Sequence, residues 1–569
     1  MIKQALTIVF LIVGITHSVA QSFRLEDIKD VFGKGKPLKM SGGVSANSVL
    51  NAGNGFSGRD PFIYYLNGNV NVNIYGQVNL PFSFNLTNSG TSYKLPSSPN
   101  RLSIHPSYKW ATAHIGDVSM TFSPYTLSGH MFTGIGVELA PDGWEFSAMY
   151  GRLQKAVEYD SIRPSFSPTY KRMGYGFKAG RISQKYQVTF NVFAAKDQLT
   201  SLPVAPDSLG VMPLQNLAGS ISFVYKPVQF IELAGEYGLS LMTNDTRMPD
   251  DGRDGILGLW TGSNMSSSYY NALKLQANYV SEASRFGIAY ERIDPDYKTL
   301  GAYYFTNDLE NITVNGYQSL LQNKLNVSLS LGYERDNLSK SKASQTSRMI
   351  GSLNIVGTLS ERVVANLSYS NFQTYTNVRS DFELINQEIT LDKLDTLNYV
   401  QLSQSANLNL NIATKKSTAE VHNLNINLSY QDAANKQGGI YHPGSITEMI
   451  NASSSYTLSF LKTGLSVNGA LNMNNTRVRN GNVFTWGPTI GASSQLLKKK
   501  VNVSSSASYN TSTLENVKQS DVFMVRLNTS YNPLKRHNIT LAYSFQWRSA
   551  LDRPSTNNSL ITAGYAYSF

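Results

Sequence analysis

The 569-residue chain contains no cysteine, which excludes disulfides, a lipid-attachment thiol and thiolate metal sites. Charged residues make up only 15% of it, well below the roughly 25% that is usual in soluble domains. After residue 20, no uninterrupted apolar run approaches the roughly 20 residues that a helix needs to cross a bilayer. A chain of this composition that spans a membrane therefore spans it with strands.

The first residues have the pattern of a secretory signal peptide. Lys3 precedes an apolar run, and Ser18-Val19-Ala20 follows it as a small-x-small cleavage site. The formal net charge of +11 does not indicate a nucleic-acid partner, because the basic residues lie in short turns rather than in one patch. We expect three parts: a signal peptide (1–20), a short periplasmic lead-in (21–36) and a folded body (37–569).

The body is built of segments of about ten residues in which apolar and polar side chains alternate. Leu408, Leu410 and Ile412 alternate with asparagines at 407, 409 and 411, and the stretch 423–428 repeats the pattern. Asparagine is a poor strand former in water, so its repeated use opposite aliphatic residues indicates one wet face and one apolar face. This predicts an all-β fold, a transmembrane antiparallel β-barrel of about 24 strands, with a range of about 22 to 26.

Turn lengths predict which connections lie together. Short turns recur at 183–185, 226–228, 281–283, 322–324, 360–362, 461–463, 497–499 and 533–535, whereas the connections 197–215, 243–270, 294–311, 374–400 and 432–448 are longer. Outer-membrane barrels keep their short turns on the periplasmic side. We therefore expect a multi-pass barrel in the cell outer membrane, with the N-terminus in the periplasm and the long loops outside.

The N-terminal part does not fit this alternation directly. Counting every alternating segment gives about 25 strands, whereas single-chain bacterial barrels usually close with an even number. Placing the apparent strand at 108–122 outside the wall restores about 24 strands, and a ring of that size, about 50 Å across, needs something to fill it. The sequence thus predicts that 87–128 is a plug-like insert, in the lumen or on the outer side.

Charged residues are expected on the inner face of the N-terminal wall, where they would suit the docking of such an insert. An alternative is that they line a water-filled lumen. The eight residues are Glu138, Glu145, Arg152, Arg172, Lys178, Glu232, Glu236 and Lys274.

The last strand also alternates strictly and ends on an aromatic residue. Phe569, Tyr567 and Tyr565 share one face, and small residues occupy the other. This end resembles the terminal-Phe signature by which bacterial outer-membrane barrels reach their assembly machinery. The resemblance implies an assembly signal, with the barrel-assembly machinery and outer-membrane lipid as partners.

Three stretches of the N-terminal part resemble a family of large outer-membrane β-barrel proteins of the Bacteroidota. They are 36–47 (beginning KPLKMSGG), 58–62 (GRDPF) and 122–139 (beginning FSPYTLSGH). The resemblance implies an outer-membrane location and a long barrel, and it brings no catalytic or ligand-binding residues with it. By analogy it also allows partners among the subunits of an outer-membrane complex.

Candidate chemistry is sparse. His105, His114 and His130, with Asp117 among them, have spacings that match no metal motif, and hydrogen bonding within the insert is the expected role. Asp245, Asp250, Asp251 and Asp254 crowd one loop without the pattern of an EF-hand. We therefore expect no metal and no cofactor.

Three expected outer loops carry an Asp-Ser/Thr-aliphatic pattern that resembles the O-glycan acceptor sequence of Bacteroidota, at Ser161, Ser208 and Thr396. No Gly-x-Ser-x-Gly elbow or Ser/His/Asp arrangement with a believable context is found, so we expect no enzymatic activity. Two functions stay open. The first is a structural or accessory component of an outer-membrane assembly or export complex, and the alternative is a plugged transport pore for uptake or export.

Overall fold

The computed structural model is almost entirely β. The residues it describes are 38–54, 61–89, 99–159, 168–250, 264–339, 347–371, 374–376, 400–434, 436–437, 440–441, 447–478, 481–551 and 553–569. The signal peptide and the lead-in predicted for 1–36 lie outside these residues. Within them, no helix is long and apolar enough to cross a membrane.

The strands follow one another along the whole described chain. In the N-terminal half they are β1 (Leu38–Gly53), β2 (Phe62–Ile74), β3 (Val78–Thr87), β4 (Arg101–Ile104), β5 (Ser107–Tyr108), β6 (Ala111–Thr121), β7 (Ser128–Leu139), β8 (Trp144–Gln154), β9 (Lys171–Ile182), β10 (Tyr186–Gln198), β11 (Gln215–Val228), β12 (Ile231–Thr243), β13 (Ser267–Val280) and β14 (Ser284–Ile293). Two short 3-10 helices, η2 (Leu199–Ser201) and η3 (Asp207–Leu209), lie between β10 and β11.

The C-terminal half continues in the same way. Its strands are β15 (Leu309–Leu320), β16 (Leu325–Arg335), β17 (Ser347–Ser360), β18 (Val363–Ser370), β19 (Thr374–Thr376), β20 (Val400–Lys416), β21 (Glu420–Ala434), β22 (Lys436–Gln437), β23 (Ile440–Tyr441), β24 (Thr447–Phe460), β25 (Leu465–Val478), β26 (Gly481–Leu496), β27 (Val501–Leu514), β28 (Val517–Tyr531), β29 (His537–Ala550) and β30 (Arg553–Ser568).

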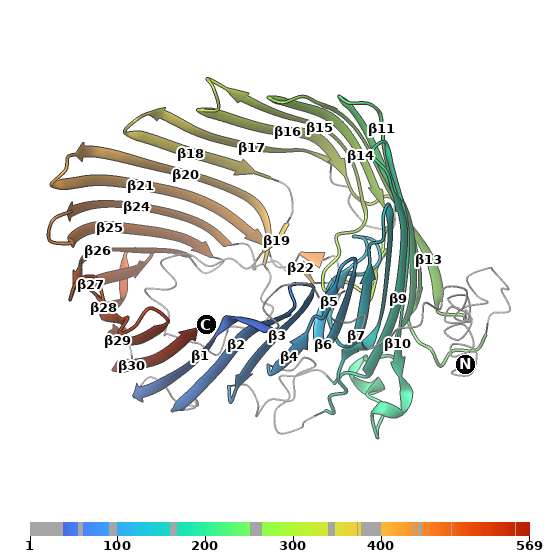
Figure 1. The fold of residues 1–569 in the computed structure, drawn as a ribbon, viewed down its shortest axis with the longest axis horizontal. Helices are drawn as coiled ribbons and strands as arrows, with labels where there is room; N and C mark the ends of the chain where they lie inside the picture. Colours follow the sequence, from blue (N-terminus) through green and yellow to red (C-terminus); the bar gives the residue numbers. More distant parts are fainter. Residues whose placement is uncertain are drawn as a thin grey trace.

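Apart from β22 and β23, which pair only with each other, these strands form one closed antiparallel ring. Neighbours in the ring follow one another along the chain, with β24 beside β21, and β30 pairs with β1, so the red C-terminal strand lies beside the blue N-terminal strand (Figure 1). Of the 28 segments in the sheet, β4 and β5 share one place in the ring, as do β18 and β19, which gives a wall of 26 strands among the described residues. Closure leaves no free strand edge.

The two faces of the wall differ as the alternation predicts. Ile115, Ile135, Tyr150 and Tyr175 pair across β6 to β9 in one register, and all four project from the outer face. At the closing seam, the outward Leu541 and Tyr565 are likewise exposed. A continuous apolar outer face on a closed barrel is the form that lipid requires, because all backbone groups are then paired within the wall.

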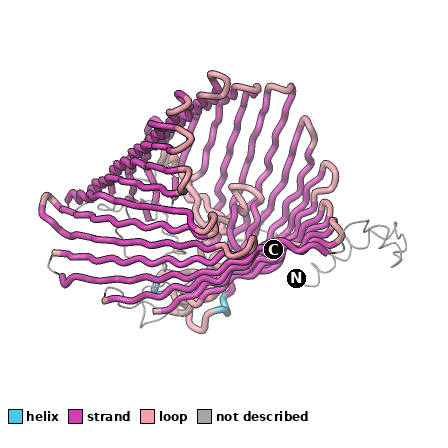
Figure 2. The backbone as a smooth tube through the Cα atoms, turned by 60° about the vertical axis from the view of Figure 1, so that its left-hand side comes forward, coloured by secondary structure: helices cyan, strands magenta, loops and turns pink. Residues whose placement is uncertain are grey.

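Connections gather at the two ends of the strands (Figure 2). One end carries the short turns, and both β1 and β30 have their chain termini there. The other end carries the long connections 199–214, 244–266 and 294–308, together with short turns such as 515–516 between β27 and β28. The short turns predicted for the first end are confirmed there, whereas which end faces the periplasm stays a prediction.

The prediction of 87–128 as a plug-like insert is wrong for 101–121, which lie in the wall. β3 pairs with β4 and β5, these pair with β6, and β6 pairs with β7, so 101–121 contributes two strands to the wall. The strand missing from the prediction is the one formed by β4 and β5. It is interrupted at Pro106, which has no N–H to donate to the neighbouring strand. The sequence predicted about 24 strands by leaving 108–122 out of the wall. In the structure that segment stays in the wall and 101–108 adds a further strand, so the wall has 26 strands.

Candidate functional site

A buried apolar cluster lies on the inner face of the wall, where a water-filled barrel would be polar. Its wall residues alternate with the outward residues of β6, β7, β8 and β10, and Leu127 and Leu300 cover them from two connections. The cluster consists of Val118, Met120, Phe122, Leu127, Phe132, Met149, Leu153, Phe193 and Ala195, with Leu300 packed against it. Two connections therefore fold inward: L6–7 (122–127) and L14–15 (294–308).

L6–7 is held against β12 and β14 by carboxylates. The Ser123 hydroxyl donates to Glu236 of β12, and the Tyr125 hydroxyl donates to Glu291 of β14 at 2.9 Å. The Ser123 Oγ in turn accepts the Tyr125 backbone N–H at 3.0 Å, which fixes the turn. The loop thus spans from the strands that bear it to strands far along the ring.

L14–15 closes over L6–7 through hydrogen bonds to backbone carbonyls. The Tyr297 hydroxyl donates to the Tyr125 carbonyl at 2.8 Å, and Thr299 Oγ1 donates to the Thr126 carbonyl at 2.6 Å. The Ser128 N–H donates to the Gly301 carbonyl at 2.9 Å. Backbone groups that would otherwise lack partners in a buried loop are paired in this way.

An aromatic cluster forms the centre of the contact. The rings of Tyr297 and Phe305 stack with centroids 4.9 Å apart, and the Tyr125 ring lies edge-on to Tyr297 at 6.0 Å. Tyr125 and Tyr297 are 2% and 0% exposed. Burial, and for Tyr125 also the neighbouring Glu291 carboxylate, raises the pKa of both phenols well above the usual range. Tyr125 therefore remains a hydrogen-bond donor at any physiological pH.

Two glycines allow the loops to approach this closely. A Cβ at Gly238 of β12 would lie 2.8 Å from the Cβ of Tyr125, and one at Gly301 would lie 2.5 Å from the Thr126 carbonyl oxygen. Both distances are shorter than real contacts allow. The packing of L6–7 against the wall and against L14–15 therefore depends on the absence of a side chain at these positions.

Seven of the eight charges predicted on the inner wall face inward, and most pair with neighbouring strands. The prediction is wrong for Arg152, which alternation along β8 places on the outer face with the exposed Tyr150. Arg172 binds the buried Asp197 at 2.8 Å, Lys178 binds Glu145 at 3.1 Å, Lys226 binds Glu232 at 3.3 Å, Lys274 binds Glu291 at 3.6 Å, His114 lies 3.4 Å from Glu138, and Arg152 donates to Thr133 at 3.4 Å. The eighth, Glu236, receives Ser123 of L6–7. Their common role is cross-strand pairing, and Glu236 and Lys274 lie beside the inward-folded loops.

A neutral, polar patch lies on the inner wall where the C-terminal half begins. Ser330, Ser352, Ser370 and Ser405 form one row across β16, β17, β18 and β20, and Ser330 donates to Asn315 at 2.6 Å. The row lines a hollow of about 430 Å³ on the inner face. Amides and hydroxyls of this kind hold water without fixing a charge.

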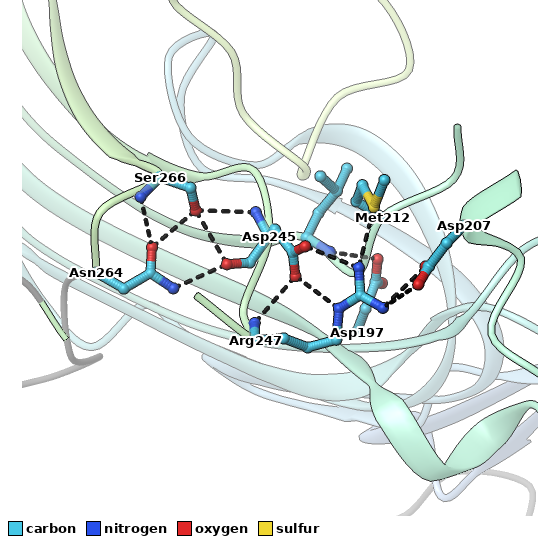
Figure 3. Close-up of polar contacts among 8 residues, drawn as sticks. Asp197, Asp207, Met212, Asp245, Arg247, Asn264 and Ser266 are labelled. Atoms are coloured by element: carbon cyan, nitrogen blue, oxygen red, sulfur yellow. Dashed lines mark hydrogen bonds and ion pairs between the residues drawn. The ribbon is translucent and has the colours of Figure 1, made fainter. Parts of the chain in front are cut away.

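At the long-loop end, one arginine joins two connections through hydrogen bonds (Figure 3). Arg247, in L12–13 (244–266), donates to both carboxylate oxygens of Asp207 in L10–11 (199–214) at 2.8 Å. It also donates to both oxygens of Asp245, which holds the pKa of that carboxyl below its usual range. Asn264 and Ser266 donate to the Asp245 carbonyl, so the loop is fixed at both ends.

The remaining candidates are scattered. His105 and His114 lie on neighbouring wall strands with their Nδ1 atoms 2.7 Å apart, whereas the His130 ring stacks on Tyr303 at 4.1 Å. Asp117 accepts from the Leu102 N–H and from Thr133. Ser208 is exposed on η3, and its glycosylation stays a prediction; Ser161, Thr396, Asp251 and Asp254 lie outside the described residues.

The C-terminal residues complete the seam. The Phe569 N–H and carbonyl bond to the Gly42 backbone at 3.0 and 3.2 Å, and the rings of Tyr567 and Phe569 lie 5.7 Å apart. Tyr565 bonds through its hydroxyl to His537 at 2.8 Å. The recognition of this end by assembly machinery stays a prediction.

Sequence reasoning missed the whole of L14–15 and its wall partner Glu291. The stretch was expected to be an ordinary outer loop. Its one unusual feature is apolar content: Tyr297, Leu300, Tyr303, Tyr304 and Phe305 all fall within it. Large aromatic residues in a connection between strands indicate that the connection is covered rather than solvated.

No protein-family model and no curated protein matches the sequence. Among solved structures, the chain is similar to the FrpB iron transporter from Neisseria meningitidis (12% identity, 93% of this chain and 81% of that chain, TM-score 0.36). It is also similar to the ferric enterobactin receptor PfeA from Pseudomonas aeruginosa (10% identity, 94% and 81%, TM-score 0.42). A third is the P pilus usher PapC translocation pore (10% identity, 94% and 100%, TM-score 0.40). At these TM-scores, none of the three functions carries over to this chain.

Proposed function

We propose that this chain is a transport pore of the bacterial outer membrane for polar solutes, narrowed from within by L6–7 and L14–15. The single observation that carries the proposal is the asymmetric inner face. The part over β16 to β20 is lined by hydroxyls and amides, and the part over β6 to β14 is apolar or charge-paired and covered by the two loops.

The size of the ring supports a passage. A wall of 26 strands, spaced at about 4.8 Å and tilted by about 40°, encloses a ring about 50 Å across, and barrels of 16–18 strands already leave an aqueous channel. The two loops rest on β6 to β14. A route for solutes along β16 to β29 is consistent with this arrangement.

The alternative, an accessory component of an outer-membrane assembly or export complex, has no contact among the described residues that favours it over the pore. Its signature would be subunits that copurify from detergent-solubilised outer membranes. Membership of the Bacteroidota family stays a prediction from the sequence motifs.

The test is conductance of the purified chain in planar bilayers. We expect stepwise ion conductance and swelling of liposomes in solutions of small sugars. Bilayers that stay electrically silent although folded barrel is inserted, as shown by heat-dependent migration on gels, would overturn the pore.

A further inference from the structure

One row of charged residues runs across the inner face below L14–15. In register, Glu236 pairs with Lys274, Lys274 with Glu291, Glu291 with Asn311, and Asn311 with Glu334. The outward row beside it, which includes Tyr237, Ile312 and Tyr333, shows that these five positions face inward. The charges alternate in sign along β12, β13 and β14, and the alternation stops at Asn311, where a cation would continue it.

A cavity of about 370 Å³ opens at this position. Ala289, Ile293 and Leu309 give it an apolar floor, and Lys274 lines it beside Glu291. Glu291 and Glu334 stand on either side of Asn311. Small-molecule sites commonly have volumes of about 300–1,000 Å³ and combine an apolar lining with a few placed polar groups. The size and lining of this cavity therefore suit a small solute.

The polar groups around the cavity differ in whether they already have hydrogen-bond or ion-pair partners. Glu291 accepts from Tyr125 and pairs with Lys274 at 3.6 Å, and Glu334 has a polar partner of its own. The side-chain amides of Gln276 and Asn311 make no hydrogen bond to any other described residue. These two amides offer donors and acceptors to a hydroxylated molecule.

We propose that this cavity is a binding subsite for a small polyhydroxylated solute that carries a primary ammonium group. The ammonium lies over Asn311, between the carboxylates of Glu291 and Glu334, and the hydroxyls bond to Gln276 and Asn311. Neighbouring strands are about 4.8 Å apart, so the strands that carry the two carboxylates are about 10 Å apart, and an ammonium midway is within reach of both. An anion at the same point meets two carboxylates and is repelled.

The subsite rests on the proposed pore only for the route by which solute arrives, so binding and conductance are measured separately. The probe is glucamine, with sorbitol as the matched control, because an ammonium replaces one hydroxyl and little else changes. Titration calorimetry of the detergent-solubilised barrel gives the binding, and the ion current in bilayers gives the block. We expect glucamine to bind at least tenfold more tightly than sorbitol, and the Glu334→Gln variant to bind glucamine about tenfold more weakly.

The sharpest variant is Asn311→Lys, which supplies the missing cation from the wall itself. It should abolish glucamine binding and block, and it should raise the temperature at which the barrel unfolds on gels. Asn366→Lys is the control, because Asn366 faces inward on β18 and pairs with Asn409, away from the row. It adds the same charge to the inner wall and should leave glucamine binding unchanged.

Equal binding of glucamine and sorbitol, or equal loss in both lysine variants, overturns the subsite whether or not the barrel conducts. If the barrel conducts and gives that result, the pore proposal stands and the subsite proposal is refuted. If the barrel does not conduct but binds glucamine, and only Asn311→Lys abolishes this binding, the pore proposal is refuted and the subsite proposal stands.

Discussion

Replacing Tyr125 by alanine should open the barrel, because this side chain joins L6–7 to both the wall and L14–15. It is 2% exposed, and truncation of a buried aromatic residue to alanine typically costs about 3–5 kcal/mol. If that cost falls on the seating of the loop, the ratio of seated to released loop falls by about a hundredfold or more, at about 1.4 kcal/mol per factor of ten. Single-channel recording should then show a larger conductance or a longer open time.

Tyr125→Phe separates the hydrogen bond from the packing. It removes the bond to Glu291 and keeps the ring among Tyr297 and Phe305. A hydrogen bond to a charged group contributes about 1.5–3 kcal/mol, so the effect should lie between those of the wild type and Tyr125→Ala. Tyr150→Ala, on the lipid-facing side, is the matched control and should conduct as the wild type does. Wild-type conductance and gating in Tyr125→Ala would refute the role of L6–7 as the constriction.

Three further predictions test other contacts. Gly301→Val should displace L14–15, since its Cβ would lie 2.5 Å from the Thr126 carbonyl oxygen, and faster hydrogen exchange in 294–308 would reveal the displacement. Arg247→Ala should release L10–11 and L12–13, measured as faster cleavage by an added protease. In the wild type, the lowered pKa of Asp245 means that the contact with Arg247 is fully present at neutral pH and is lost only as the pH falls below about 4, so acid should give the same cleavage pattern. Ile135→Arg, 58% exposed on the outer face, should destabilise the folded barrel by about 2–4 kcal/mol if it lies at the bilayer midplane, as read from urea unfolding in lipid vesicles.

The faces of the strands could be predicted from the sequence because alternation is a local property. Leu408 and Asn409 point to opposite sides whatever strand lies beside them, so the pattern survives without knowledge of the fold. The same locality explains the placement of turns. Each short turn, such as 497–499, carries its own signal and needs no distant partner.

The strand count failed for a reason that is also local. Parity allows 24 or 26 strands equally, and the choice depended on whether 101–108 is a strand. Pro106 interrupts its alternation, and β4 and β5 are only four and two residues long. Periodicity is least informative in short, interrupted segments. The prediction therefore obtained an even number by removing 108–122 from the wall instead of adding 101–108.

The inward loops could not be predicted because their partners are far away along the chain. Tyr125 and the residue that caps its carbonyl, Tyr297, are 172 positions apart. No periodicity links them. Serine and tyrosine in L6–7 are ordinary loop residues until the pairing of β7 to β14 brings Glu236 and Glu291 within hydrogen-bond distance of them.

The inner charges nevertheless indicate where a barrel is covered. A charge facing open water needs no partner, whereas one shielded from water must be paired or it costs several kcal/mol, of the order of 3–5 when one partner of a buried pair is removed. Asp197 is 3% exposed and pairs with Arg172, and Glu145 pairs with Lys178, on the strands that also carry the apolar cluster. The row from β16 to β20 uses serine instead, which water can satisfy. Paired charges on inward positions therefore identify the covered part of such a wall, even where the covering loop itself cannot be identified from the sequence.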